Sequence, residues 1–298
     1  MQFTTLKLQK FLMNNLEVKL NESLKNYCTF KIGGNAKYLI IVYSNSTLIE
    51  VCKQLKLHNI KYKVIGVGAN QLFSDVGFDG AIIVNKTKNI EFKNNLVYAD
   101  GGVNLTSLII KASELGLSGL ENLSGIPSTL AGGIINNVGA FGTEIADCIE
   151  KVECYNENFK KITLTKSVCN FSYRNSIFKQ KNLIITKAIL KLKQDEKSLI
   201  KKRINDAILK KSTTQPINYP SAGSVFKRCE IIPAKVIDEL ELKGTKIGGA
   251  EISTKHAGFI VNNSSATSKD VKDLINLIKQ KVKSATNLDL ETEIEFVE

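Results

Sequence analysis

One serine and one arginine stand out in this chain as side chains that could act on a substrate. Ser224 lies in the segment GSVFK (residues 223–227), between a flexible glycine and an apolar, strand-like pair. Its hydroxyl can donate or accept one proton, and the absence of a Gly-x-Ser-x-Gly motif argues against a hydrolase nucleophile. Arg174 is one of few arginines in a lysine-rich chain, and its planar fork suits a carboxylate or an enolate. Taken alone, Ser224 could equally be a turn serine, and Arg174 is better interpreted as a surface arginine.

A first glycine-rich segment, residues 64–72 (VIGVGANQL), follows a predicted strand and has the features of a phosphate-binding loop. Gly66 and Gly68 allow the backbone to turn with positive φ and to present successive N–H groups to an anion. The segment is not a dinucleotide-binding fingerprint, because Gln71 stands where the third glycine is needed and no helix follows. An ordinary tight turn is the alternative.

A second segment, residues 124–133 (SGIPSTLAGG), predicts a helix that begins with Pro127 in its first turn. Ser128 and Thr129 add hydroxyls there, and free N–H groups at a helix start attract anions. Two more glycines follow in residues 136–142 (NNVGAFG). So many small residues in an apolar stretch favour a flat ligand close to the backbone, and a helix-packing seam is the alternative.

Composition narrows the class of protein. The chain has 298 residues, a hydrophobic content of 43% and a net charge of +12, which fit one large or two ordinary domains with a real core. No apolar run reaches the ~18 residues of a membrane span, and the first residues do not form a signal peptide. We therefore expect a cytoplasmic protein without a membrane partner. The six cysteines are scattered and form no Cys-x-x-Cys pair, so we expect reduced thiols and no metal site.

The lysines are spread evenly along the chain, without aromatic residues beside them. The densest cluster, residues 197–211, has a helical pattern with one apolar side, which is typical of a solvated helix face. We therefore expect no nucleic-acid partner. A basic, non-enzymatic protein that binds RNA stays an alternative, because it would explain the charge but not the glycine loops.

Strands and helices alternate along the chain, which predicts an α+β protein in two parts. Hydrophobic periodicity predicts helices at 46–58, 104–115, 234–240 and 269–283, and a long helix that starts within 194–202 and ends near Pro216. The same patterns predict strands at 38–43, 62–65, 81–84, 90–92, 96–98, 151–155, 161–164, 183–192, 258–261 and 293–297. The charged start of the long helix marks our predicted domain boundary, between residues 1–195 and 196–298.

Several motifs together resemble one family, the UDP-N-acetylenolpyruvoylglucosamine reductases (UDP-N-acetylmuramate dehydrogenases), in its shorter subclass. They run in order from about residue 26 to the end of the chain. The motifs are TFKIGGN (29–35), GVGAN (66–70), LSGIP (123–127), YR (173–174), GSVF (223–226), IGGA (247–250), KHAGFIVN (255–262) and LETEI (290–294).

The resemblance implies an FAD-binding fold of the vanillyl-alcohol-oxidase type, with two α+β subdomains in residues 1–195, and a C-terminal α+β substrate domain in residues 196–298. It implies FAD as cofactor and NADPH as reductant, used to convert a UDP-sugar enolpyruvate to UDP-N-acetylmuramate for peptidoglycan. We expect FAD to be non-covalent, because no His or Cys lies in the glycine-rich segments, and we expect a monomer. Another FAD oxidoreductase of the same fold with a different substrate is the main alternative.

The resemblance also assigns roles to residues. It implies Arg174, Ser224 and Glu293 as the catalytic residues, with Ser224 as the proton donor and the other two acting on developing charge. Substrate contacts fall to Tyr173, Lys227 and Lys255, with Lys211 as a further candidate for the substrate diphosphate. Cofactor contacts fall to Gly66, Gly68, Ala69, Asn70, Gln71, Ser124, Gly125, Ile126, Pro127, Thr129, Gly132, Asn137, Gly139 and Gly142.

Two positions depart from the family pattern. Ala69 stands where a serine is usual in the first loop, so one contact to a diphosphate is expected to be lost. Glu295 stands where a basic residue is common. Strand alternation puts Glu291, Glu293 and Glu295 on one face, so a charged solvent face is the simplest structural interpretation of Glu293.

Overall fold

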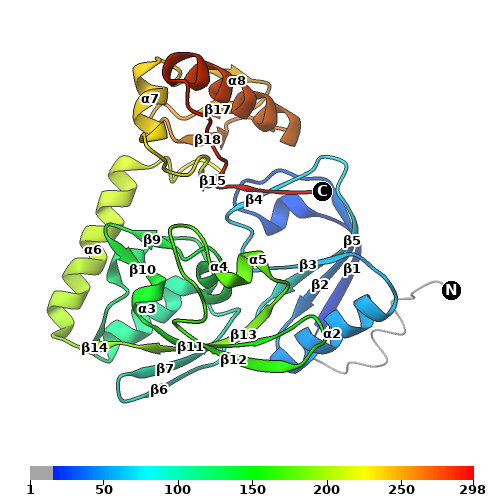
Figure 1. Cartoon of the computed structure of the whole chain (residues 1–298), viewed down its shortest axis with the longest axis vertical. Helices are drawn as coiled ribbons and strands as arrows, with labels where there is room; N and C mark the ends of the chain where they lie inside the picture. Colours follow the sequence, from blue (N-terminus) through cyan, green and yellow to red (C-terminus); the bar gives the residue numbers. More distant parts are fainter. Residues whose placement is uncertain (1–15) are drawn as a thin grey trace. The chain divides into compact units, whose positions relative to one another are not determined.

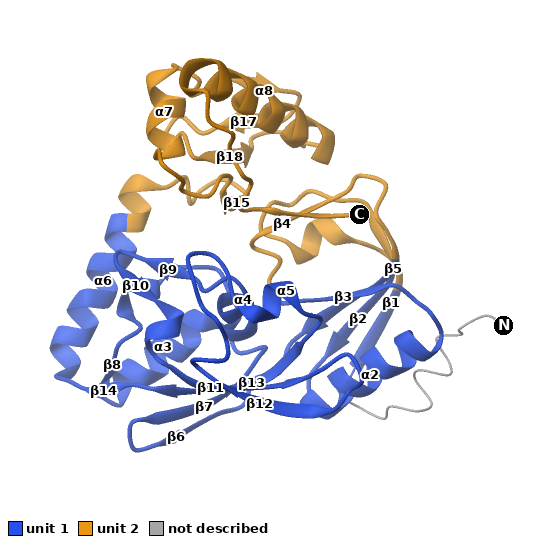
Figure 2. Ribbon diagram, viewed as in Figure 1, with its two compact units in different colours: residues 1–19, 38–66, 80–210 blue, residues 20–37, 67–79, 211–298 orange. Residues whose placement is uncertain are grey.

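The computed structural model describes residues 16–298 (Figure 1). Residues 1–15, on which the prediction of no signal peptide depends, lie outside the described residues. The described chain forms two compact units, coloured separately in Figure 2. Unit 1 contains residues 16–19, 38–66 and 80–210, and unit 2 contains residues 20–37, 67–79 and 211–298. The units therefore interleave along the sequence, and the division into functional domains at residue 195 stays a prediction.

The first sheet has the strand order β1-β2-β5-β3, with β1 (Leu16–Ser23), β2 (Asn35–Val42), β5 (Phe78–Asn85) and β3 (Tyr62–Ile65). The chain passes between the two units within β1, β2 and β5. Helix α2 (Asn45–Leu57) begins where the Ser44 side chain accepts from the N–H of Thr47, a typical N-cap. Its apolar residues Leu48, Val51, Cys52 and Leu55 pack on Ile40, Val42, Ala81 and Ile83.

The main core of unit 1 lies on an antiparallel sheet of five strands, in the order β12-β11-β13-β7-β6. These strands are β6 (Ile90–Lys93), β7 (Leu96–Asp100), β11 (Ile149–Tyr155), β12 (Lys161–Thr165) and β13 (Ile184–Lys191). Helix α3 (Leu105–Glu114) packs its apolar residues into this core, and the first part of α6 (Lys197–Thr214) adds Ile200 and Ile204. Asn104 caps α3, which lies within the predicted helix of residues 104–115, and Gly116 follows it with a φ of +73°.

Shorter elements complete unit 1. They are β8 (Leu117–Ser118), η2 (Glu121–Leu123), α4 (Leu130–Ile135), β9 (Gly139–Ala140), β10 (Thr143–Glu144), η3 (Ile145–Asp147), α5 (Ile177–Gln180) and β14 (Lys193–Gln194). Strand β14 pairs with β8, and α6 begins at Lys197, within the predicted range of residues 194–202.

Unit 2 contains a sheet of four strands in the order β15-β18-β17-β16. Its strands are β15 (Ser221–Ser224), β16 (Lys246–Ile247), β17 (Ala250–Ile252) and β18 (Phe259–Asn262), and its helices are η1 (Leu24–Tyr27), α7 (Pro233–Glu239) and α8 (Ser268–Thr286). Strand β19 (Glu295–Val297) pairs in parallel with β4 (Gln71–Phe73), which follows the first glycine-rich segment.

The predicted α+β class is confirmed, and the elements with strong periodicity lie within a few residues of their predicted positions. In the part of the chain that the structure describes, no helix is both long enough and apolar enough to cross a membrane.

Candidate functional site

The first glycine-rich segment forms the loop between β3 and β4. The main-chain N–H groups of residues 66–70 have no hydrogen-bond acceptor among the described residues. Gly68 has a φ of +63°, and a Cβ there would lie 2.4 Å from the carbonyl oxygen of Tyr27, so the turn requires glycine. Gly68 is buried and the other four residues are partly buried. A run of successive main-chain N–H groups without acceptors in the protein fits a ligand with several oxygens, such as a diphosphate.

Gln71, the residue after this loop, gives a second sign of a polar ligand. Its side-chain oxygen Oε1 is buried and has no hydrogen-bond partner among residues 16–298. Its Nε2 lies 3.4 Å from Oε2 of Glu295. Glu295 is the residue that stands where the family pattern commonly has a basic side chain. Ala69 offers only its N–H to the loop, which is consistent with a nest that needs no side chain.

The second glycine-rich segment leads into α4. Thr129 is the N-cap, since its Oγ1 accepts from the N–H of Gly132 at 3.3 Å. Pro127 therefore lies before the helix and not in its first turn as the sequence predicts, because the Thr129 side chain already satisfies the helix start. The N–H groups of Gly125, Ser128 and Thr129 have no acceptor in the described chain. Gly125 has a φ of +75°.

Gly66 of the first glycine-rich segment and Thr129 of the second lie close together inside unit 1. A Cβ on Gly66 would lie 2.3 Å from Oγ1 of Thr129, so only glycine allows this approach. Ser124 is buried beside Leu123 at the start of the second segment, whereas Ile126 is half-buried. These N–H groups and glycines fit the diphosphate-bearing cofactor that the sequence resemblance implies. The individual contacts to FAD stay predictions.

Asn137, a predicted cofactor contact, uses its side chain for hydrogen bonds within the protein. Its side chain is fully buried and donates to Oε2 of Glu144 at 2.6 Å and to the carbonyl of Ser172 at 3.0 Å. Its Oδ1 accepts from the N–H of Ala146 at 3.3 Å. This carboxamide therefore joins the β9–β10 hairpin to the turn that carries Arg174. Gly142, in the same hairpin, has a φ of +82°.

Arg174 lies at the tip of a tight turn closed by two hydrogen bonds of 3.1 Å between the main chains of Ser172 and Asn175. Its φ is +53°, a left-handed conformation that is uncommon for arginine. Its Nη2 donates to the carbonyl of Gly139 at 3.3 Å, and its guanidinium lies 5.3 Å from the ring centre of Tyr173, which is exposed. Arg174 is thus held beside the glycine-rich residues 139–142 in unit 1.

Ser224 lies at the end of a β-bulge in unit 2. Ser221 pairs with Val261 and Ser224 with Phe259, so β15 carries one residue more than β18 between the two pairs. Gly223 supplies the bend with a φ of +80°, and a Cβ there would touch nothing within 4 Å. Bulges re-aim side chains beside active sites. The Ser224 hydroxyl is partly exposed and makes no hydrogen bond with any residue that the structure describes.

Glu293 lies beside Val225, which follows Ser224 at the end of β15, and beside the first glycine loop. Its N–H donates to the carbonyl of Val225 at 2.7 Å. Nδ2 of Asn70 donates to the carbonyl of Glu293 at 3.0 Å, and the N–H of Glu295 donates to the carbonyl of Asn70 at 2.9 Å. Backbone pairing within unit 2 thus brings together Ser224, Glu293 and the predicted cofactor residue Asn70.

Burial separates Glu293 from its acidic neighbours. Glu291 and Glu295 are exposed, whereas Glu293 is half-buried. Leu290 and Ile294 are buried as alternation predicts, but the pattern breaks at Phe296, which is 38% exposed. The strand geometry therefore does not present the three glutamates as one solvent face.

The predicted substrate lysines have protein partners. Lys227 forms an ion pair with Glu291, and Lys255 donates from Nζ to the carbonyl of Ser212 at 2.6 Å. Lys211 is only 6% exposed, and burial lowers its pKa to about 8. Its role as a contact to the substrate diphosphate stays a prediction.

His256 is a structural hydrogen-bond acceptor. Its Nδ1 accepts from the N–H of Gly258 at 3.1 Å, and burial lowers its pKa. The carbonyl of Gly258 in turn accepts from the N–H of Val225, next to Ser224. The imidazole thus supports the turn against which the serine strand pairs.

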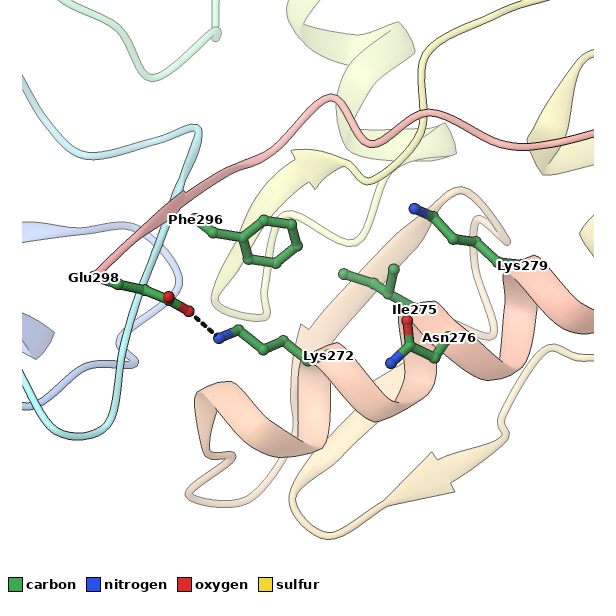
Figure 3. A pocket seen from close by; sticks show the side chains of 6 residues that line it. All are labelled: Lys272, Ile275, Asn276, Lys279, Phe296 and Glu298. Atoms are coloured by element: carbon green, nitrogen blue, oxygen red, sulfur yellow. Dashed lines mark hydrogen bonds and ion pairs between the residues drawn. The ribbon is translucent and has the colours of Figure 1, made fainter.

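A hollow of about 530 Å³ lies elsewhere in unit 2, between α8 and β19 (Figure 3). Its lining contains no predicted site residue, and Lys272 there pairs with Glu298 and lies 5.7 Å from the ring centre of Phe296. Among the described residues, no group of His, Cys, Asp and Glu side chains could hold a metal ion.

Sequence reasoning gave no role to two residues that contact the site strands. Thr29 donates to the carbonyl of Ser221, and Asn262 donates to the carbonyls of Phe30 and Lys31. Both lie in motifs that mark the family resemblance. Their place in these motifs was the signal that the sequence offered.

Two family models match the chain. The FAD binding domain model matches residues 36–163, and the model of the UDP-N-acetylenolpyruvoylglucosamine reductase C-terminal domain matches residues 215–297. The two matches cover the segments that carry the second glycine loop and the Ser224 strand.

Similar proteins extend over nearly the whole chain. UDP-N-acetylenolpyruvoylglucosamine reductase of Thermotoga sp. (strain RQ2) is 41% identical over 94% of this chain and 93% of its own length. The enzyme of the same name from Caldicellulosiruptor bescii is 39% identical over 97% of this chain and 94% of its own. The crystal structure of UDP-N-acetylenolpyruvylglucosamine reductase (MurB) from Thermus caldophilus superposes with a TM-score of 0.82 and 31% identity, covering 95% of this chain and 99% of that one. The chain therefore belongs to the UDP-N-acetylenolpyruvoylglucosamine reductase family and has its FAD-binding fold.

Proposed function

We propose that this protein reduces UDP-N-acetylglucosamine enolpyruvate to UDP-N-acetylmuramate in peptidoglycan precursor synthesis, with FAD as cofactor and NADPH as reductant. The observation that carries the proposal is identity of about 40% to enzymes of this name over more than nine tenths of the chain. The FAD-binding family match and the unpaired main-chain N–H groups of residues 66–70 support the cofactor.

Residues 66–70 would hold the FAD diphosphate through the main chain. The N–H groups before α4 are further proposed contacts to FAD. Bound FAD supplies hydride transfer between NADPH and the enolpyruvyl double bond. The protein contributes placement, charge stabilisation and one proton. No step requires a side chain of the glycine loops, which explains why Ala69 can replace the usual serine.

Arg174 would stabilise the negative charge that develops beside the substrate carboxylate. A guanidinium offers two parallel donors to an enolate or a carboxylate, and a donor fixed in advance needs no reorganisation during the reaction. The turn of residues 172–175 and the contact with Gly139 support such fixed placement.

Ser224 would donate the proton that completes the reduction. Its hydroxyl is partly exposed and has no hydrogen bond to a described residue, so a substrate can receive it directly. Glu293 would share the stabilisation of charge with Arg174, since its main chain is tied to both Val225 and Asn70. Tyr173, Lys227 and Lys255 stay proposed substrate contacts.

The proposal includes an FAD-binding domain in residues 1–195 and a substrate domain in residues 196–298. The two family models, which end at residue 163 and start at residue 215, support a division between them. We also propose that the enzyme is cytoplasmic and monomeric. Sedimentation of the purified protein measures its mass and so tests whether it is a monomer.

The experiment is an anaerobic titration of the purified protein. We expect a yellow protein whose flavin is released on denaturation, is bleached by NADPH and is restored by the enolpyruvyl sugar nucleotide. UDP-N-acetylglucosamine, which lacks the double bond, is the control and should leave the flavin reduced. A colourless protein that FAD does not reconstitute would refute the cofactor. Reduced flavin that the enolpyruvyl substrate fails to reoxidise would refute the proposed substrate.

A further inference from the structure

Thr29 contacts both the first glycine loop and strand β15, which carries Ser224, within unit 2. Its Oγ1 donates to the carbonyl of Ser221 at 2.7 Å, and its N–H lies 3.4 Å from the carbonyl of Gly68 in the first glycine loop. Ser221 is 192 residues away in the sequence. One residue therefore links the loop that would hold the cofactor diphosphate to the strand that carries the proposed proton donor.

Thr29 meets the serine strand where its regular pairing stops. Ser221 is the last residue in register before the β-bulge, and Ser224 is the first residue in register after it. The left-handed Gly223 allows the strand to bend between them. Because a bulged segment has fewer cross-strand constraints than a regular strand, the direction of the Ser224 side chain depends on how its near end is fixed.

Asn262 fixes the same region from the neighbouring strand. Its Nδ2 lies 3.2 Å from the carbonyl of Phe30 and 3.4 Å from that of Lys31, and its N–H donates to the carbonyl of Pro220 at 2.9 Å. Lys31 turns the chain with a φ of +57°. Residues 29–31 are thus fastened to β15 by Thr29 and to β18 by Asn262.

We propose that Thr29 is a positioning residue for the proton-transfer step, an inference that rests on the proposed role of Ser224. Its hydroxyl holds the start of the bulge at a fixed place relative to the first glycine loop, and so sets where the Ser224 hydroxyl stands. Misplacing a reacting group by about 1 Å can lower a rate by about a hundredfold. The effect should fall on reduction of the double bond and not on reduction of the flavin by NADPH.

The test compares Thr29→Val, which keeps the shape and removes the donor, with Thr29→Ser, which keeps the donor. We expect Thr29→Val to bind FAD and be reduced by NADPH at a rate within about twofold of wild type. Its reoxidation by the enolpyruvyl substrate should slow by about 10- to 100-fold. Thr29→Ser should restore most of that rate. Thr245→Val, before β16 at the opposite edge of the sheet, is the matched control and should change neither half-reaction.

A double variant separates positioning from general weakening. If Thr29 acts through Ser224, then Thr29→Val should add little to the loss already caused by Ser224→Ala. Additive losses would overturn the proposal, and so would unchanged reoxidation in Thr29→Val or an equal loss in both half-reactions. If Thr29→Val does not fold, Thr29→Cys, a weaker donor, should show the same selective loss at smaller size. Wild-type enzyme that binds FAD but is never reoxidised by the substrate is a separate result, which refutes the proposed function.

Discussion

Arg174 adopts a backbone conformation that arginine seldom uses. A non-glycine residue in the left-handed region costs on the order of 1 kcal/mol, and such residues gather at functional sites where the surrounding structure holds them in place. Here the Ser172–Asn175 hydrogen bonds and the contact with Gly139 hold the turn. This strain supports a functional role for Arg174. The sequence motif alone could not distinguish such a role from that of an ordinary surface arginine.

The guanidinium geometry of Arg174 should matter more than its charge. Arg174→Lys keeps the charge but loses the paired donors, so we expect reoxidation of reduced enzyme by the substrate to slow by about 10²-fold or more. The melting temperature should change little. Stopped-flow kinetics with Arg203→Lys as a control tests this, since Arg203 pairs with Glu121 and Asp195 away from the predicted site residues. Near-wild-type turnover of Arg174→Lys would show that the fork is unimportant.

Lys211 should lower the stability of the folded protein. Its side chain is 6% exposed, and the drop of its pKa from 10.5 to about 8 corresponds to about 3 kcal/mol against the charged form. Lys211→Met should therefore raise the free energy of unfolding at pH 7 by about 1–3 kcal/mol. Lys202→Met, at an exposed position of the same helix, should change it little.

The pH dependence of this effect has a definite sign. Between about pH 8 and 10.5 the folded protein loses the Lys211 proton while the unfolded chain keeps it, so wild-type stability rises relative to Lys211→Met. The difference between the two proteins should narrow over that window. Denaturant unfolding at pH 7, 9 and 10.5 measures it, and a difference independent of pH would contradict the burial argument.

At the scale of elements, the site depends on strands that pair over long sequence distances. Residues 291–293 pair with 225–227, and β19 continues beside β4. The N-terminus of α8 is also held from a distance. Asp75 accepts from the N–H groups of Ser268 and Lys269 at 2.8 and 3.1 Å, and from the Ser268 hydroxyl at 2.7 Å. A carboxylate at a helix start is favourable because of the free N–H groups and the helix dipole.

Thr267 is the N-cap residue of α8, so Asp75→Ala should leave that cap in place, but it removes three further hydrogen bonds and should lower the free energy of unfolding by about 1–2 kcal/mol. Asp79→Ala is the matched control, since Asp79 only forms an exposed ion pair with Lys37 and should contribute little. Thermal unfolding of both variants tests the difference. Equal melting temperatures for the two variants would show that the Asp75 carboxylate does not stabilise α8.

The sequence predicted the elements that carry strong periodicity and missed those made by pairing. Leu48, Val51, Cys52 and Leu55 mark the buried face of α2 at helical spacing, so α2 was predicted to within one residue at each end. Strand β15 contains Gly223 and only four residues, and nothing local indicates that it pairs with β18. The short α4 was placed too early, because a proline before a helix resembles a proline in its first turn.

At the scale of the whole molecule, each unit gathers segments that are distant in sequence. Residues 20–37 and 67–79 belong with the C-terminal residues in unit 2, so Thr29 and Asn70 meet strands about two hundred residues away. Local patterns carry no information about such contacts. The predicted site residues came from motif identity, and the contact of Glu293 with Asn70 and Val225 became visible only in the structure.

In the proposed mechanism, main-chain loops hold the flavin while the Ser224 hydroxyl delivers a proton to the substrate. The most direct measurement follows the two half-reactions separately in Ser224→Ala under anaerobic conditions. We predict that NADPH reduces its flavin at a rate within about twofold of wild type, while reoxidation by the enolpyruvyl sugar nucleotide falls by about 10²- to 10⁴-fold. An equal loss in both half-reactions, or a wild-type rate of reoxidation, would contradict the account.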